Sequence, residues 1–289
     1  IPTITIEEYT TTPTNQDIVE VARIDKGSFD ASEGLLIEEE GKKATYTFTD
    51  KGSFTFNVTD EAGNKTSKTV IIENINKEKP VITIDSYSTD PTNQDVIVQF
   101  SAKSIDKTIG GEIVEADITK DISFGVLPEG VSQRENTLIF TKNREVNLNI
   151  TDKWGNKAEE KTVEISNIDK LFPTSTYKLK IDGEVIEKDK LVNVNVEIEL
   201  TATDTEANAD YSNSGIKEIR LITTENASDF KYSDNVATVT VSTNGDYVFE
   251  IEDNAGNVKT ETVKISTINK TKPVITVTPH SEVATNQDI

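Results

Sequence analysis

Three short motifs recur along this chain of 289 residues, always in the same order. They are Thr-Asn-Gln-Asp, then Asp-x-x-Gly-Asn, then Ile-Asn/Asp-Lys-x-x-Pro. Their copies are Thr14–Asp17, Thr92–Asp95 and Thr285–Asp288; Asp60–Asn64, Asp152–Asn156 and Asp253–Asn257; and Ile75–Pro80, Ile168–Pro173 and Ile268–Pro273. A fixed order of motifs at such intervals indicates tandem domains rather than one large fold.

The prolines that open successive repeats set the length of each repeat. They are Pro2, Pro80, Pro173 and Pro273, which are 78, 93 and 100 residues apart. We therefore predict three complete repeats and the first strand of a fourth, at 1–78, 79–171, 172–271 and 272–289. The third repeat lacks Thr-Asn-Gln-Asp, and the segment from Lys188 to Val192 is expected to fill that place.

Each repeat alternates apolar and polar residues with a period of two, which is typical of strands with one buried face. In the first repeat Phe54, Phe56 and Val58 precede the Asp-x-x-Gly-Asn motif, and another such run follows it. The glycine of the motif supplies the left-handed residue of a tight hairpin turn. The middle repeat has one extra residue between Asn156 and Val163, which predicts a bulge or a shifted loop. No convincing amphipathic helix is present, so the fold class is all-β, as antiparallel sandwiches.

The combination Pro-Val-Ile-Thr-Ile, Thr-Asn-Gln-Asp-Val, Asp-x-Ala-Gly-Asn and Ile-Asn-Lys-x-x-Pro resembles the tandem bacterial immunoglobulin-like domains of Gram-positive surface and secreted proteins. The resemblance covers essentially the whole chain. It implies tandem immunoglobulin-like sandwiches at the bacterial cell surface or in a secreted protein. It also implies a non-catalytic stalk, spacer or adhesin segment, whose partners are neighbouring repeats and a host or cell-wall glycan or protein. The alternatives are a binding accessory region of a secreted hydrolase, or a fibre subunit linked by strand addition.

Composition excludes several classes of function. With 51 acidic against 30 basic residues the net charge is −21, which repels a nucleic-acid backbone. No run approaches the ~20 apolar residues of a membrane span. The single histidine, His280, cannot supply a catalytic triad to each repeat, and no glycine-rich phosphate loop is present, so we expect no enzyme activity. The chain has no Cys or Met, and we expect it to be an internal segment of a longer protein.

The linkers between repeats are about four residues long and end in proline, which fixes φ, so the repeats are expected to form a semi-rigid, elongated rod. In a sandwich of this kind, each Thr-Asn-Gln-Asp loop should face the hairpin turn of the following repeat. Trp154, the only tryptophan, lies at one such turn, either as an apolar plug or as a ring on which a ligand stacks. The residues expected at interdomain contacts are Thr14, Asn15, Gln16, Asp17, Thr92, Asn93, Gln94, Asp95, Asp152, Trp154, Asn156, Asp253 and Asn257.

Two arrangements of acidic residues suggest a calcium site. Asp204, Glu206, Asn208 and Asp210 alternate along one loop, and Ca²⁺ takes several oxygen ligands. The competing interpretation of that loop is a solvated acidic segment. In the second arrangement the aspartates of the hairpin turns bind the metal together with acidic residues of the linkers. The competing interpretation is that these aspartates only form hydrogen bonds within their own turns. The residues of that second set are Asp60, Asp152 and Asp253 with Asp169 or Glu78.

Overall fold

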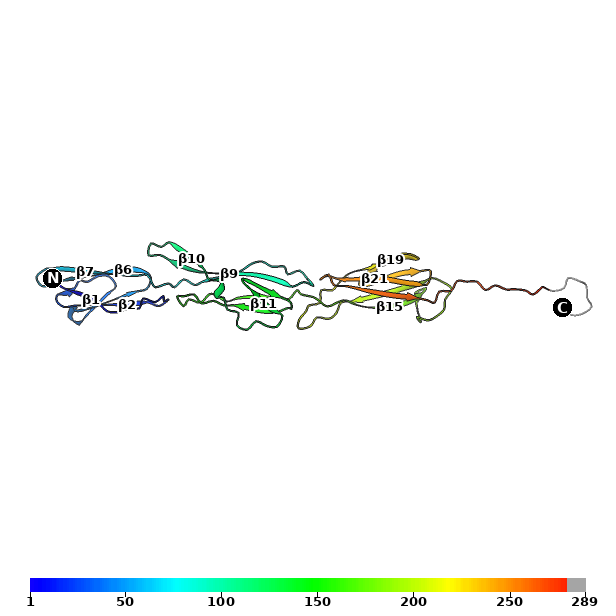
Figure 1. Ribbon diagram of the computed structural model, residues 1–289, viewed down its shortest axis with the longest axis horizontal. Coiled ribbons are helices and arrows are strands. Elements are labelled where there is room, and N and C mark those ends of the chain that lie inside the picture. Colours follow the sequence, from blue (N-terminus) through cyan, green and yellow to red (C-terminus); the bar gives the residue numbers. More distant parts are fainter. Residues whose placement is uncertain (280–289) are drawn as a thin grey trace, which may run out of the picture. The chain divides into compact units, whose positions relative to one another are not determined.

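The computed structural model describes residues 1–279 (Figure 1). His280, Thr285–Asp288 and the end of the predicted fourth-repeat strand lie outside these residues. We use first, second and third repeat as names for residues 1–78, 79–171 and 172–271. The described part of the chain is built of antiparallel strands with two short 3₁₀ turns, which confirms the all-β class. None of its helices is long and apolar enough to cross a membrane.

Contacts divide the chain into two compact units. One holds Ile1–Thr89 and Asp95–Ser166, and the other holds Asp90–Gln94 and the chain from Asn167 onward. The first unit therefore includes the first repeat and most of the second. The second unit includes the third repeat and the Thr92–Gln94 part of one motif.

In the first repeat, one sheet has the order β1-β2-β5-β4 and the other has the order β3-β6-β7. The elements are β1 (Ile4–Ile6), β2 (Ile18–Ile24), β3 (Ser28–Phe29), β4 (Leu35–Glu38), η1 (Glu39–Gly41), β5 (Lys43–Phe48), β6 (Gly52–Thr59) and β7 (Lys65–Ile72). Both sheets contribute to one apolar core, with Ile18 and Phe48 from the first sheet and Phe56 and Ile72 from the second. This is the sandwich that the alternation predicts.

The second repeat pairs its strands in the order β10-β9-β12-β11, with β8 on β9, and has a separate hairpin of β13 and β14. The elements are β8 (Val81–Ile84), β9 (Val96–Lys107), β10 (Ile113–Asp117), η2 (Thr119–Asp121), β11 (Val131–Arg134), β12 (Thr137–Phe140), β13 (Glu145–Leu148) and β14 (Lys161–Glu164). Val146 faces Val163 across the hairpin, whereas Thr151 faces Lys157, so the returning strand has one extra residue. The predicted bulge is confirmed.

The third repeat has sheets of order β16-β15-β17-β20-β19 and β18-β21-β22, which share one buried apolar cluster. The elements are β15 (Thr174–Ile181), β16 (Glu184–Ile186), β17 (Val196–Thr203), β18 (Ile216–Leu221), β19 (Ala227–Ser233), β20 (Val236–Val241), β21 (Gly245–Asp253) and β22 (Val258–Ile265). Residues 272–279 form no strand and are exposed.

The first and last motifs are joined in each repeat by one parallel bridge. Thr14 pairs with Ile75 and Thr92 pairs with Ile168. Val192 pairs with Ile268 in the same way, so the Lys188–Val192 segment does take the place of Thr-Asn-Gln-Asp in the third repeat. The bridge fixes the start of each linker to its own repeat, and the glycines of the three hairpins have the left-handed φ that the turn requires: 80° at Gly63, 89° at Gly155 and 89° at Gly256.

Candidate metal centre

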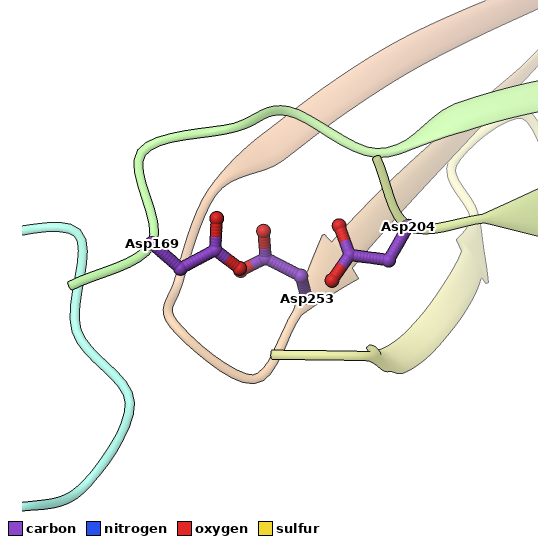
Figure 2. A group of neighbouring side chains, drawn as sticks. All are labelled: Asp169, Asp204 and Asp253. Atoms are coloured by element: carbon purple, nitrogen blue, oxygen red, sulfur yellow. The ribbon is translucent and has the colours of Figure 1, made fainter. Parts of the chain in front are cut away.

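Three aspartates from separate parts of the second unit converge at one end of the third repeat (Figure 2). Asp169 follows the bridge residue Ile168, Asp204 follows β17, and Asp253 ends β21. One carboxylate oxygen from each lies within 4.8 Å of the others. The exposed fractions of the three residues are 0%, 7% and 0%. The cluster is therefore both dense in negative charge and shielded from water.

Hydrogen bonds to the hairpin and to the neighbouring loop hold Asp169 and Asp253 in place. The Asp253 carboxylate accepts bonds from the backbone N–H and the side-chain amide of Asn257, both at 2.8 Å. The same Asn257 amide donates to the Asp169 carbonyl at 2.9 Å. The Asp169 carboxylate accepts the N–H of Leu171 at 3.0 Å and that of Ser214 at 2.8 Å. One asparagine thus links the linker to the hairpin.

The surroundings of Asp204 disfavour its ionisation. Its carboxylate accepts the N–H of Gly215 at 2.6 Å and that of Thr205 at 2.9 Å. Burial raises the pKa of Asp204 above its ordinary value, and the charges of Asp169 and Asp253 add to this, while the two N–H donors act against it. None of the three carboxylates forms an ion pair with a Lys or Arg among residues 1–279.

The second repeat has a neutral counterpart of this cluster. Ser104 lies as far from the start of β9 as Asp204 lies from the start of β17, and Asn76 follows the bridge residue Ile75 as Asp169 follows Ile168. Asn156 donates to the Asn76 carbonyl at 2.9 Å, and Ser104 Oγ donates to Asp152 Oδ2 at 3.4 Å. The counterpart therefore keeps the bond from the hairpin asparagine to the linker carbonyl but has one carboxylate instead of three.

The four loop residues predicted as calcium ligands are not brought together. Only Asp204 belongs to the cluster. Glu206 and Asn208 are exposed, and Asn208 Oδ1 accepts the N–H of Asp210 at 2.8 Å and that of Tyr211 at 3.0 Å. The loop begins where β17 ends at Thr203, and of its acidic side chains only that of Asp204 lies in the cluster. The structure instead joins Asp204 to two members of the other predicted set, Asp253 and Asp169.

The residues expected at interdomain contacts lie as follows within each unit. In the first unit Asn15 lies at the hairpin turn, where a Cβ on Gly155 would be 3.5 Å from its Nδ2. In the second unit the Asn93 N–H donates to the Ala255 carbonyl at 3.1 Å. The hydroxyls of Thr14 and Thr92 accept the backbone N–H of the glutamine two residues later in the same motif. The side-chain amide of each glutamine donates to the asparagine before it. Asp17 forms an ion pair with Lys77. Asp95 is exposed.

Trp154 is buried at the tip of its hairpin, with 7% of its surface exposed. The ammonium nitrogens of Lys51 and Lys153 lie over its ring at 5.0 and 4.9 Å from the centroid. Lys51 also pairs with Asp106 at 2.7 Å. The indole is thus part of a cation–π and ion-pair contact between the first and second repeats, within the first unit.

A hollow of about 730 Å³ lies in the second repeat. It is lined by Ser101, Asp117, Thr119, Lys120, Gln133, Glu135 and Asn136, none of which is aromatic. Sugar rings are commonly held by stacking on aromatic side chains. This hollow does not provide such a platform, and Trp154 does not line it.

No family model matches this chain, and no curated protein sequence matches it. Solved structures with a similar arrangement include cadherin domains 1–4 of protocadherin gamma B7, which is 10% identical with a TM-score of 0.38, over 88% of this chain and 72% of that chain. A 1.5-MDa bacterial ice-binding adhesin is 16% identical with a TM-score of 0.35, over 91% and 95%. The bacterial integrin-binding protein invasin is 13% identical with a TM-score of 0.27, over 92% and 60%. At this level of similarity the fold assignment rests on the chain's own sheets and cores.

Proposed function

We propose that this chain is a non-catalytic, extracellular spacer or adhesin segment of a bacterial surface or secreted protein. In this proposal the three repeats are domains, and the third is stabilised by Ca²⁺ bound to Asp169, Asp204 and Asp253. The observation that carries the metal assignment is the convergence of three buried carboxylates that have no cationic side chain as partner. The short linkers and the bridge in each repeat support a spacer role.

Electrostatics explain why a cation belongs at this cluster. Two unit charges 4.8 Å apart repel by about 3 kcal/mol at the effective dielectric constant of ~20 that suits protein sites. Three such pairs disfavour a fully ionised cluster unless a positive charge or a proton compensates. A divalent cation offsets two of the three negative charges and attracts all three carboxylates.

The ligand chemistry suits calcium. Ca²⁺ takes six to eight oxygen ligands in flexible geometry, whereas Mg²⁺ requires a near-ideal octahedron. Each carboxylate oxygen of the cluster accepts one hydrogen bond, from Leu171, Ser214, Thr205, Gly215 or Asn257. A carboxylate has about four lone-pair sites, so every oxygen keeps one for a metal. A site of this kind would fix the linker segment around Asp169 to the third repeat.

Calorimetry of the full chain with millimolar calcium and with EDTA tests this proposal. A ligand at ~100 times its Kd adds ~2.7 kcal/mol of stability, which for a ~100-residue domain raises Tm by roughly ten degrees or more. The matched control is the double variant D169N/D204S, which reproduces the neutral counterpart in the second repeat. We expect the calcium shift in the wild type and not in the variant. Equal shifts in both proteins, or no shift in the wild type, would contradict the metal assignment.

A fibre subunit linked by strand addition is the second candidate, because residues 272–279 form no strand and expose apolar side chains. Val274, Ile275 and Val277 are 89%, 88% and 76% exposed. An exposed strand-forming segment can add to the sheet edge of another chain. The test is the oligomeric state of the full chain beside one that ends at residue 271. Concentration-dependent assembly of the longer chain alone would favour the fibre.

A further inference from the structure

Glu20 occupies an inward-facing position of β2, in the core of the first repeat. Its neighbours on the same face are Ile18 and Ala22, which belong to the apolar cluster. Glu20 is 0% exposed, and neither of its carboxylate oxygens has a hydrogen-bond partner. Counted from the start of the strand, the corresponding residues of the other repeats are Val98 and Ile198, both buried. An acid thus replaces an aliphatic side chain in one repeat of three.

The surroundings of Glu20 offer no compensating charge. Tyr46 faces it in register on β5, and among the described residues no charged side chain contributes to the shift in the pKa of Glu20. The Tyr46 ring stacks on Phe54 of β6 with centroids 3.8 Å apart. The remaining cluster residues, from β1 to β7, are apolar. Burial is the sole cause of the shift that raises the pKa of Glu20 to about 7.

An ionised carboxylate without a partner is far more costly to bury than a neutral acid, so the group binds a proton instead. We propose that Glu20 makes the first repeat a pH-responsive element, which is tightly packed while the acid is neutral and opens more readily once it ionises. The part that opens first is the pairing of β2 with β5, since ionisation draws this side chain toward water.

The direction of the effect follows from proton linkage. The folded repeat holds the Glu20 proton up to about pH 7, whereas an unfolded chain releases it near 4.5. The stabilisation is therefore complete below pH 4.5 and is lost as pH rises through 7. Between pH 4.5 and 7 the equilibrium constant for opening of the first repeat rises about tenfold per pH unit, or about 300-fold in all.

Hydrogen exchange of the full chain, followed by mass spectrometry on peptides covering β2 and β5, tests this inference. Rates at pH 5 to 8 are corrected for the intrinsic pH dependence of exchange. Two variants serve as references: E20Q keeps the size of the side chain but does not titrate, and E20V reproduces the residue of the second repeat.

We expect the protection of the wild type relative to E20Q to fall about tenfold per pH unit between pH 5 and 7 and to level off above. Relative to E20V the slope should be the same. If E20V does not fold, the E20Q comparison decides alone. A constant ratio of wild type to E20Q across this range would overturn the proposal.

Discussion

Asp204 and Ser104 lie equally far from the start of corresponding strands in two repeats, and they differ in charge. Asp169 and Asn76 differ in the same way after the bridge residues Ile168 and Ile75. One hydrogen bond is common to both places, since Asn257 and Asn156 each donate to the linker carbonyl at 2.9 Å. The extra carboxylates are thus not required for that hydrogen bond, and the proposed Ca²⁺ would offset the cost of burying them.

The variant D169N/D204S should be more stable than the wild type when metal is removed. It relieves the like-charge repulsion of three buried carboxylates. This gain is partly offset, because Asn at 169 keeps one acceptor oxygen for the N–H groups of Leu171 and Ser214, and Ser at 204 keeps one for those of Thr205 and Gly215. In EDTA at pH 7.5 we expect a gain of roughly 1–3 kcal/mol in the free energy of unfolding of the third repeat, measured by urea denaturation. At saturating calcium the order should reverse. A variant less stable than the wild type in EDTA would show that the carboxylates stabilise the fold without a metal.

From the sequence alone Glu20 was not singled out, and Asp204 was grouped with its loop neighbours rather than with Asp169 and Asp253. Glu20 lies between Ile18 and Ala22 on the buried side of an alternating pattern. Asp204 continues the same kind of pattern after Leu200 and Ala202, which are also buried. A charged residue on that side signals either a partner or an altered pKa. The acidic residues next to Asp204 in the loop hid this signal, because their own spacing resembled a ligand set. Local spacing cannot show that residues 169, 204 and 253 meet.

At the scale of elements, the Asp-x-x-Gly-Asn hairpin occurs in each of the three repeats, and the contacts of its asparagine differ among them. Asn64 bonds only within its own turn, to Asp60. Asn156 and Asn257 bond to their own turn and also reach the linker carbonyls of Asn76 and Asp169. The motif has thus one local role, which the sequence predicts, and one tertiary role, which depends on a neighbouring linker.

Alanine at the three asparagines should separate these roles. Asn64→Ala is expected to change the free energy of unfolding by about 0.5 kcal/mol or less, as at other exposed sites. Asn156→Ala and Asn257→Ala each leave a carbonyl of the linker without its donor and should cost about 1–3 kcal/mol. Chemical denaturation of the full chain measures all three. A loss at Asn64 as large as at the other two would mean that the turn alone accounts for the stability.

The elements themselves were largely predictable. The period-2 runs, the left-handed glycines and the extra residue before Val163 follow from local chemistry, and the structure has each of them. The place of the segment from Lys188 to Val192 was also predicted, because the linker motif repeats even where Thr-Asn-Gln-Asp is missing, and its bridge to Ile268 agrees with that place. The stacked Tyr46 and Phe54 and the two lysines over Trp154 could not be predicted, since they depend on how separate strands and loops approach one another.

At the scale of the whole molecule, the chain divides into two compact units, and we expect each to unfold in a transition of its own. Trp154, the only tryptophan, belongs to the first unit, and the three-aspartate cluster belongs to the second. Tryptophan fluorescence therefore follows the unfolding of the first unit, which does not contain the three-aspartate cluster. Calcium should leave the fluorescence-detected Tm unchanged and raise the Tm of the other transition seen by calorimetry.

Adding the missing carboxylates to the first unit should transfer the calcium response. The variant N76D/S104D places two aspartates beside Asp152, where Asn156 already supplies the contacts that Asn257 makes in the third repeat. In EDTA its fluorescence-detected Tm should fall, because three buried carboxylates repel one another. With millimolar calcium that Tm should rise by roughly ten degrees. The single variant S104D, with two carboxylates, is the control and should respond weakly. If N76D/S104D loses stability and calcium does not restore it, three converging carboxylates are insufficient on this scaffold, and other oxygen atoms of the third repeat must take part in binding.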